Sequence, residues 1–174
     1  KMRPQELVSG LHIQNRFALL SEQLHQTLRP DNVHAPDRES TAERVKKEIG
    51  SAFVPADGSG RRCIIKGRDL VRGVPHEIEV TQAEIAEALS EPLSQIVSVV
   101  RSALESTAPE IAADIVESGI VMAGGGALLD GIATLLSHET GLPVTIAEDP
   151  LNCTALGAGR TLEDATLAGV LHAG

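Results

Sequence analysis

Aromatic side chains are almost absent from this chain of 174 residues. Phe17 and Phe53 are the only two, and there is no Trp or Tyr. Proteins that bind single-stranded nucleic acid stack the bases on aromatic rings, so this kind of surface is excluded. The formal net charge of -9 also disfavours nucleic acid as a partner, because binding to a phosphate backbone needs a cationic surface. We therefore expect an aliphatic core, and we attribute the charge to solubility.

Cysteine is nearly as scarce. Cys63 and Cys153 lie far apart in the sequence, with no CxxC spacing and no His at metal-ligand spacing from either of them. This pattern gives poor support to a zinc site and to a disulfide framework. We expect two reduced, partly buried thiols and no metal site.

Long apolar runs are missing as well. No segment of the chain approaches the ~20 apolar residues that span a bilayer. The first residues also lack the cationic-then-apolar order of a secretory signal. These absences predict a cytoplasmic protein.

The composition of the chain changes near residue 40. Residues 1–40 carry five basic and five acidic side chains, so the whole net charge of -9 belongs to residues 41–174. This leader contains an apolar stripe at the spacing of one helical face, followed by a polar linker, RPDNVHAPDRES. The stripe consists of Ile13, Phe17, Leu20, Leu24 and Leu28. The amphipathic helix could pack on its own domain or dock on a partner or membrane surface, and both interpretations remain open.

A short helix and a hairpin are predicted next. Ser40 and Glu43 form a capping box before the helix, and Gly50 is a natural stop. The stretches RRCIIKGRDL and PHEIEVT then read as two strands around a turn at Gly73, with a polar outer face.

A long helix follows the hairpin. Thr81 and Glu84 form a second capping box, after which apolar residues continue at helical spacing. Pro92 either kinks this helix or divides it in two. Residues 41–108 are therefore predicted to form a helix–hairpin–helix subdomain.

The rest of the chain alternates helices and strands, which is typical of an α/β layer. Thr107 with Glu110 predicts the start of a helix that Gly119 ends. The following elements are a strand over 120–123, a glycine triplet, a helix over 128–138, a strand over 144–147 and a last helix that opens at Pro150, with Asp149 as its N-cap.

The triplet Gly124, Gly125 and Gly126 raises a question of its own. One glycine is enough to turn a strand into a helix, so three indicate that something approaches the backbone closely. A strand, a glycine turn and a helix N-terminus form a common nucleotide site, but the triplet matches neither GxGxxG nor GxxxxGK[ST]. From these residues alone, a structural turn and a ligand contact are equally open.

Several motifs together resemble one family. They are TAERVKKEIGSAF, GRDLVRGVP, APEIAADIVESGI and GIVMAGGGALLDGIATLLSHETGLPVTIAEDPLNCTALGAGRTLED. From about Thr41 to Asp164, the chain closely resembles the C-terminal half of the MreB family of bacterial actin-like, rod-shape-determining proteins. The resemblance implies an α/β fold of the actin, heat-shock chaperone and sugar kinase superfamily, limited here to the second lobe and the closing helices. Residues 109–174 would then be its nucleotide-side subdomain with C-terminal closing helices.

The resemblance also implies a nucleotide site. In that family, the helix that carries ERVK and the glycine turn hold the adenosine of ATP from two sides. Carried over to this sequence, the contacting residues are Glu43, Arg44, Val45 and Lys46 on the helix, and Gly124, Gly125, Gly126 and Ala127 on the turn. Without the resemblance, we would interpret Glu43 and Lys46 as a solvent-exposed ion pair. Ala123 departs from the family, whose members usually have Thr at this position.

The phosphate loops of the family and its Mg²⁺-associated carboxylates would lie before Thr41. Residues 1–40 match none of that pattern. We therefore expect ATP to be contacted on its adenosine side only, with no metal ligands and no catalytic residues, because phosphoryl transfer relies on positioned phosphates, a metal and an oriented water. The chain is not predicted to be an enzyme.

By resemblance, the function is that of a cytoskeletal protein that forms ATP-dependent filaments, maintains rod cell shape and guides cell-wall synthesis. The implied partners are further copies of the protein and the cell-shape and wall-synthesis proteins at the inner membrane surface, where peripheral attachment is also expected. The alternative is a non-polymerising interaction module or an inert truncation product of the same fold. A sugar-kinase-like activity is disfavoured, because no substrate-binding carboxylate motif is recognisable.

Overall fold

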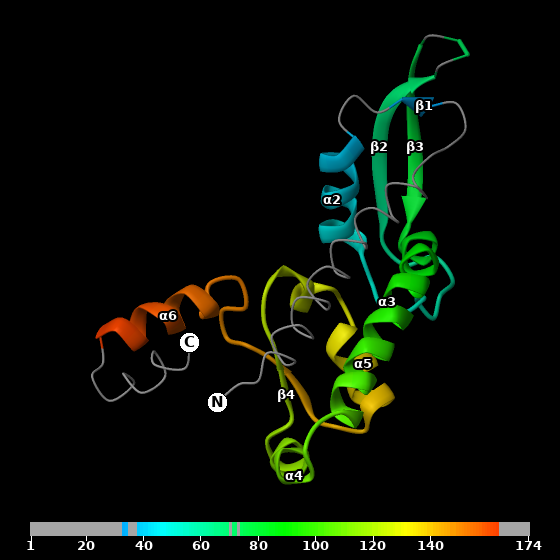
Figure 1. Cartoon of the computed structure of the whole chain (residues 1–174). Coiled ribbons are helices and arrows are strands. Elements are labelled where there is room, and N and C mark those ends of the chain that lie inside the picture. The colour runs from blue at the N-terminus through cyan, green and yellow to red at the C-terminus, as the bar shows by residue number, and fades with distance from the viewer. Residues whose placement is uncertain (1–32, 35–37, 70, 73, 164–174) are drawn as a thin grey trace. The chain divides into compact units, whose positions relative to one another are not determined.

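The computed structural model describes residues 33–34, 38–69, 71–72 and 74–163 (Figure 1). The expected amphipathic helix of the leader lies outside these residues.

The described residues form two compact units. The hairpin unit consists of residues 33–34, 38–69, 71–72, 74–98 and 129–131. The glycine-turn unit consists of Val99–Leu128 and residues 132–163.

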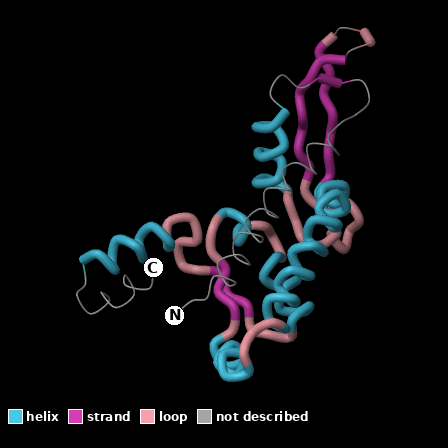
Figure 2. The backbone as a smooth tube through the Cα atoms, viewed as in Figure 1, coloured by secondary structure: helices cyan, strands magenta, loops and turns pink. Residues whose placement is uncertain are grey.

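The hairpin unit contains a three-stranded antiparallel sheet with the strand order β1-β2-β3 (Figure 2). The strands are β1 (Val33–His34), β2 (Arg62–Asp69) and β3 (Pro75–Thr81). Cys63 pairs with Val80, and both side chains are buried. The side chains on the opposite face are exposed except for the half-buried Thr81, and they are polar except for Ile64 and Pro75. The ion pair between Arg62 and Glu79 crosses this face. The predicted hairpin with a polar face is confirmed.

Helix α2 (Arg38–Ile49) places Val45 and Ile49 in the core, as their spacing predicts. The helix already includes Ser40, so the predicted capping box at Ser40 is wrong: this residue is inside the helix and not at its N-terminus. Gly50 follows the helix, and its N–H donates to the carbonyl of Lys46 at 2.9 Å. The predicted stop is confirmed.

Helix α3 (Gln82–Glu105) begins with the predicted capping box. The Thr81 N–H donates to Glu84 Oε2 at 2.7 Å, and the Glu84 N–H donates to Thr81 Oγ1 at 3.3 Å. The helix continues through Pro92, so the alternative that Pro92 divides it is wrong. A proline removes only one helical hydrogen bond, and the ring of Pro92 is buried with the apolar stripe of the helix. That stripe includes Ile85, Leu89, Leu93 and Ile96.

Helix α4 (Pro109–Ser118) begins without the predicted capping box. Its N-cap is Ala108, which has no side-chain cap, and Thr107 Oγ1 donates instead to the carbonyl of Ala103 at 2.8 Å, at the end of α3. The predicted box of Thr107 and Glu110 is therefore wrong. Gly119 ends α4 as predicted, with a φ of 74° that favours glycine.

The glycine-turn unit has a two-stranded parallel sheet of β4 (Ile120–Met122) and β5 (Val144–Ile146). Between these strands lie the 3₁₀ helix η1 (Gly125–Leu128) and helix α5 (Ile132–Thr140), so the predicted helix over 128–138 starts later than expected. Helix α6 (Cys153–Glu163) ends the described chain.

The start of α6 also differs from its prediction, because a turn over Pro150 comes before the helix. Asp149 does cap this turn: its Oδ1 accepts the N–H of Asn152 at 3.3 Å.

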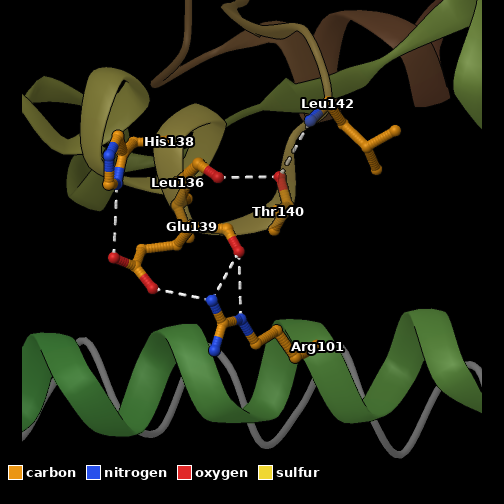
Figure 3. Close-up of polar contacts among 6 residues, drawn as sticks. All are labelled: Arg101, Leu136, His138, Glu139, Thr140 and Leu142. Carbon is orange, nitrogen blue, oxygen red and sulfur yellow. Dashed lines mark hydrogen bonds and ion pairs between the residues drawn. The ribbon is translucent and has the colours of Figure 1, made fainter.

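Arg101, in the last turns of α3, fixes the C-terminal end of α5 (Figure 3). Its Nε and Nη2 donate to the backbone carbonyl of Glu139 at 3.0 and 2.7 Å, and Nη2 also meets the carboxylate at 2.8 Å. Thr140 Oγ1 donates to the Leu136 carbonyl at 2.7 Å and accepts the N–H of Leu142 at 3.3 Å. These bonds satisfy groups that a helix end leaves without partners, so the chain enters β5 from a fixed point.

Candidate functional site

The glycine turn joins β4 to η1, and only its first glycine has a left-handed backbone. Gly124 has a φ of 79°, a conformation that an L side chain rarely adopts. Its N–H donates to the carbonyl of Pro150, and its own carbonyl accepts the N–H of Ala127 at 3.2 Å. The fold of the turn therefore requires glycine at position 124.

Gly125 is different, because its φ is not in the left-handed region. A Cβ built on this exposed residue would meet only Leu151 Cδ2, at 3.6 Å, which is ordinary van der Waals contact. A Cβ on Gly124 would have nothing within 4 Å. The chain therefore leaves open space beside both glycines.

Gly126 and Ala127 lie in η1, as Gly125 does. Gly126 is half-buried, whereas the Ala127 side chain is buried completely. Ala127 therefore anchors the turn to the core of its unit.

On α2, Val45 and Arg44 both contact their own unit. Val45 is 0% exposed. The Arg44 guanidinium reaches β2, where Nη2 donates to the Ile64 carbonyl at 3.3 Å and Nη1 lies 3.1 Å from Glu48 Oε2. The side chains of Arg44 and Val45 thus hold α2 in place.

Cys63, on β2, forms hydrogen bonds with both Arg44 and Glu48. Its thiol donates to Glu48 Oε2 at 3.0 Å and accepts from Arg44 Nη1 at 3.3 Å. Burial raises the pKa of the Cys63 thiol, and the hydrogen bond to Glu48 raises it further. The hydrogen bonds from Cys63 and Arg44 hold the pKa of Glu48 below its usual range. At neutral pH, the group is therefore a thiol, a carboxylate and a guanidinium.

Glu43 and Lys46 form an ion pair on α2, and Lys47 Nζ lies 3.4 Å from the second oxygen of Glu43. The side chains of Glu43 and Lys46 are 38% and 21% exposed, so both remain partly open to solvent. The predicted ion pair is confirmed, but it is half-buried and not solvent-exposed as expected.

The predicted residues thus fall into two groups. Glu43, Arg44, Val45 and Lys46 belong to the hairpin unit, and the residues from Gly124 to Ala127 belong to the glycine-turn unit.

Sequence reasoning missed Pro150 and Leu151 as neighbours of the glycine turn. Pro150 accepts the Gly124 N–H, and Leu151, 63% exposed, lies beside Gly125. The only local signal was the Asp-Pro pair at 149–150, which indicates a turn but not what the turn approaches.

In the ranges that the structure describes, no three His, Cys, Asp or Glu side chains are grouped so that they could hold a metal ion. None of the helices in those ranges has the length and apolar character needed to cross a membrane.

Comparison with known proteins gives the family. The model of the MreB/Mbl protein family matches residues 32–169. The cell shape-determining protein MreB of Escherichia coli (strain K12) is 54% identical over 125 residues, which are 72% of this chain and 35% of that protein. Cell shape-determining protein Mbl of Bacillus subtilis (strain 168) is 41% identical over 126 residues. The chain thus spans about a third of the length of the curated relatives that it matches.

Solved structures agree on the fold. The crystal structure of MreB5 of Spiroplasma citri bound to ADP has a TM-score of 0.75 and 34% identity, over 89% of this chain and 46% of that one. The same protein bound to AMPPNP gives a TM-score of 0.75 at 33% identity. The sequence-based assignment to the C-terminal half of an actin-like fold is therefore confirmed. The chain belongs to the MreB/Mbl family.

Proposed function

We propose that this cell shape protein homologue binds adenine nucleotides through their adenosine and associates with further copies of itself. In this proposal, the chain contributes to rod cell shape and to the guidance of wall synthesis, as a cytoplasmic protein at the inner face of the cell membrane. Its further partners would be other cell-shape and wall-synthesis proteins.

One observation carries the nucleotide proposal. The backbone conformation at position 125 does not require glycine, and a Cβ atom at this position would contact only Leu151 Cδ2. A residue without a side chain at such a point is useful when a ligand lies against the backbone.

The eight predicted residues are proposed as adenosine contacts in two groups, one in each unit. From α2, the polar atoms of Glu43 and Lys46 would contact the ribose or the base, while Arg44 and Val45 position the helix. From the turn, Gly124, Gly125 and Gly126 would offer their backbone to the adenosine, while Ala127 anchors η1. When bound, the nucleotide would supply the phosphates on which the family's filament cycle depends.

The solved relatives support the choice of ligand. Crystal structures show Spiroplasma citri MreB5 bound to ADP and to AMPPNP, which share an adenosine and differ in their phosphate chains. We assign no phosphate-binding residue, metal ligand or catalytic group to this chain. Binding through the adenosine alone predicts little preference between ADP and ATP.

A competition experiment tests this proposal. A fluorescent ADP analogue, labelled on its phosphate end, is bound to the chain and displaced by adenosine, ADP or ATP. Displacement by adenosine at concentrations similar to those of ADP supports binding through the nucleoside. Failure of all three compounds to displace the analogue, or failure of the analogue to bind, would favour the alternative of a module that does not bind nucleotide.

A further inference from the structure

Cys63 lies where helix α2 packs alongside β2 (Figure 1). Its side chain is 5% exposed and lies on the same face of the sheet as the buried Ile65 and Val80. An apolar side chain would fill this position, but a thiol occupies it and meets two charged groups. Its Sγ donates to Glu48 Oε2 at 3.0 Å and accepts from Arg44 Nη1 at 3.3 Å. The thiol is thus a polar group among apolar neighbours.

The three groups form a closed ring of hydrogen bonds. Arg44 Nη1 completes the ring, since it lies 3.1 Å from Glu48 Oε2 as well as 3.3 Å from the sulfur. Arg44 Nη2 extends the contact to the backbone of β2, where it donates to the carbonyl of Ile64 at 3.3 Å. A thiol is a weak donor, but hydrogen bonds to charged groups are stronger than those between neutral groups. The ring therefore joins α2 to β2 more firmly than a neutral thiol contact would.

The protonation state of Cys63 fits this arrangement. Burial raises the pKa of the Cys63 thiol and the hydrogen bond to Glu48 raises it further, whereas Arg44 lowers it. The net rise keeps the proton on the sulfur at neutral pH, so Cys63 donates and Glu48 accepts. A thiolate at this position would repel the Glu48 carboxylate.

Helix geometry connects the ring to the proposed nucleotide contacts. Arg44 and Glu48 are four residues apart, so they share the side of α2 that faces β2. Glu43 and Lys46 are three residues apart and share another side, about 150° around the helix axis. A rotation of α2 about its axis would therefore break the ring and displace Glu43 and Lys46 together.

We propose that Cys63 is a positioning residue for the adenosine contacts on α2. The thiol, held between Glu48 and Arg44, fixes the rotation of α2 and with it the side chains of Glu43 and Lys46. Cys63 itself does not touch the ligand. This inference rests on the proposed function, because it assigns a further residue to the α2 side of that site.

Cysteine also serves as a small apolar residue in protein cores, and this alternative makes the opposite prediction. An apolar role would be kept by Cys63→Ala and lost by Cys63→Ser, because Ser would bury a hydroxyl among apolar neighbours. A hydrogen-bonding role would be kept by Cys63→Ser, which retains a donor and an acceptor, and lost by Cys63→Ala. The order of the two variants therefore separates the two roles.

Calorimetric titration of the parent and these two variants with ADP tests the inference. Cys63→Ala should weaken ADP binding about fivefold, and Cys63→Ser should bind within about twofold of the parent. Urea unfolding checks that each variant is folded under the conditions of the titration. A Cys63→Ala chain that binds like the parent, or a Cys63→Ser chain that binds more weakly than Cys63→Ala, would overturn the inference.

Glu48→Gln breaks the same ring from a second member. A chain with both Glu48→Gln and Cys63→Ala should bind ADP about as well as the weaker single variant, since the two changes remove one ring. Glu87→Gln, at an exposed position of α3, removes the same charge outside the ring and should leave ADP binding unchanged. Additive losses of affinity for Glu48→Gln and Cys63→Ala would contradict a shared ring and overturn the inference.

The infrared S–H stretching band gives a readout that needs no nucleotide. The stretching frequency falls as the hydrogen bond strengthens. Cys63 donates to a carboxylate at 3.0 Å, whereas the Sγ of Cys153 lies 3.6 Å from the carbonyl oxygen of Pro150. The parent should therefore show two bands, of which the lower disappears in Cys63→Ser and moves to higher frequency in Glu48→Gln. A Cys63 band at or above the frequency of the Cys153 band would overturn the inference.

A failure of this inference can be distinguished from a failure of the proposed function. A parent that binds ADP, with variants that do not follow the stated order, would overturn the role of Cys63 alone. A parent that binds no ADP would overturn the adenosine contacts and, with them, this role, even where the S–H band lies at the expected frequency.

Discussion

A Cβ atom built on Gly125 lies 3.6 Å from Leu151 Cδ2, so the fold has room for a side chain at this glycine. The preceding residue, Gly124, is needed for its φ of 79°. The two neighbours therefore have different roles: Gly124 forms the turn, and Gly125 keeps the space beside the turn open.

Gly125→Val should weaken the binding of ADP at least tenfold, because the side chain fills the space that the proposed adenosine occupies. The free energy of unfolding should change by less than about 0.5 kcal/mol, as for other surface substitutions. Titration calorimetry and urea unfolding measure the two effects. Gly157→Val is the matched control, since Gly157 is exposed on α6 and a Cβ there has nothing within 4 Å. A Gly125→Val chain that binds ADP like the parent would favour a purely structural turn.

Gly131→Ala should lower the free energy of unfolding by about 2–5 kcal/mol. Gly131 has a φ of 77°, and a Cβ there would lie 2.8 Å from Phe53 Cδ2. The left-handed conformation costs a side chain about 1–2 kcal/mol, and overpacking adds about 1–3 kcal/mol. Gly141→Ala isolates the first of these costs, because Gly141 has a φ of 72° and nothing within 4 Å of its Cβ. Equal losses of unfolding free energy in the two variants would show that the Phe53 ring moves away from the new side chain at no cost.

The capping box of α3 should be worth about 1 kcal/mol. Glu84→Ala removes the acceptor of the Thr81 N–H and should lower the free energy of unfolding by that amount, as measured in urea. Glu110→Ala is the comparison, since Glu110 has the same Thr-x-x-Glu spacing but α4 begins without a side-chain cap. If Glu110→Ala lowers the free energy of unfolding as much as Glu84→Ala does, the capping box of α3 does not contribute the predicted stability.

These two boxes show what local sequence can and cannot predict. The pattern at Thr81 and the pattern at Thr107 are the same, and only the first forms. Thr107 bonds to the Ala103 carbonyl at the end of α3, and Pro109 starts α4 without needing a cap for its missing N–H. The choice between these bonds depends on where the preceding helix ends, which the four-residue pattern does not encode.

For the candidate site too, the sequence predicted some features of the structure and not others. Helical spacing places Val45 in the core, and the structure confirms it. The contact of Arg44 with Ile64 could not be predicted, because it depends on how α2 packs on β2, far along the sequence. Likewise, the triplet predicts a turn, but only the backbone shows that the left-handed residue is Gly124 and not Gly125.

The stability of the chain should fall at acidic pH. Three carboxylates of the hairpin unit have a pKa below the usual range: Glu48 through Cys63 and Arg44, Asp57 through the N–H groups of Ser59 and Gly60, and Asp69 through those of Arg72 and Val71. A carboxyl with a lowered pKa in the folded state stabilises the fold above its unfolded pKa, which is about 4. This stabilisation is lost as the pH falls through the lower, folded values.

Urea midpoints measured between neutral pH and about pH 3 check this prediction. They should be nearly constant down to about pH 4.5 and then decrease. Asp57→Asn should make the decrease smaller, because one of the three groups no longer titrates. Glu87→Gln, at an exposed position of α3, should leave the parent curve unchanged. A midpoint that rises on acidification would contradict the assigned hydrogen bonds.

Calorimetric titration of the parent chain with ADP, and with ATP in the presence of Mg²⁺, tests the central claim most directly. Binding through the adenosine predicts that both nucleotides bind weakly and that their affinities differ by less than tenfold, or about 1.4 kcal/mol. Removal of Mg²⁺ should change neither value. No heat of binding with either nucleotide, or tight binding that depends on Mg²⁺ and the γ-phosphate, would contradict the account.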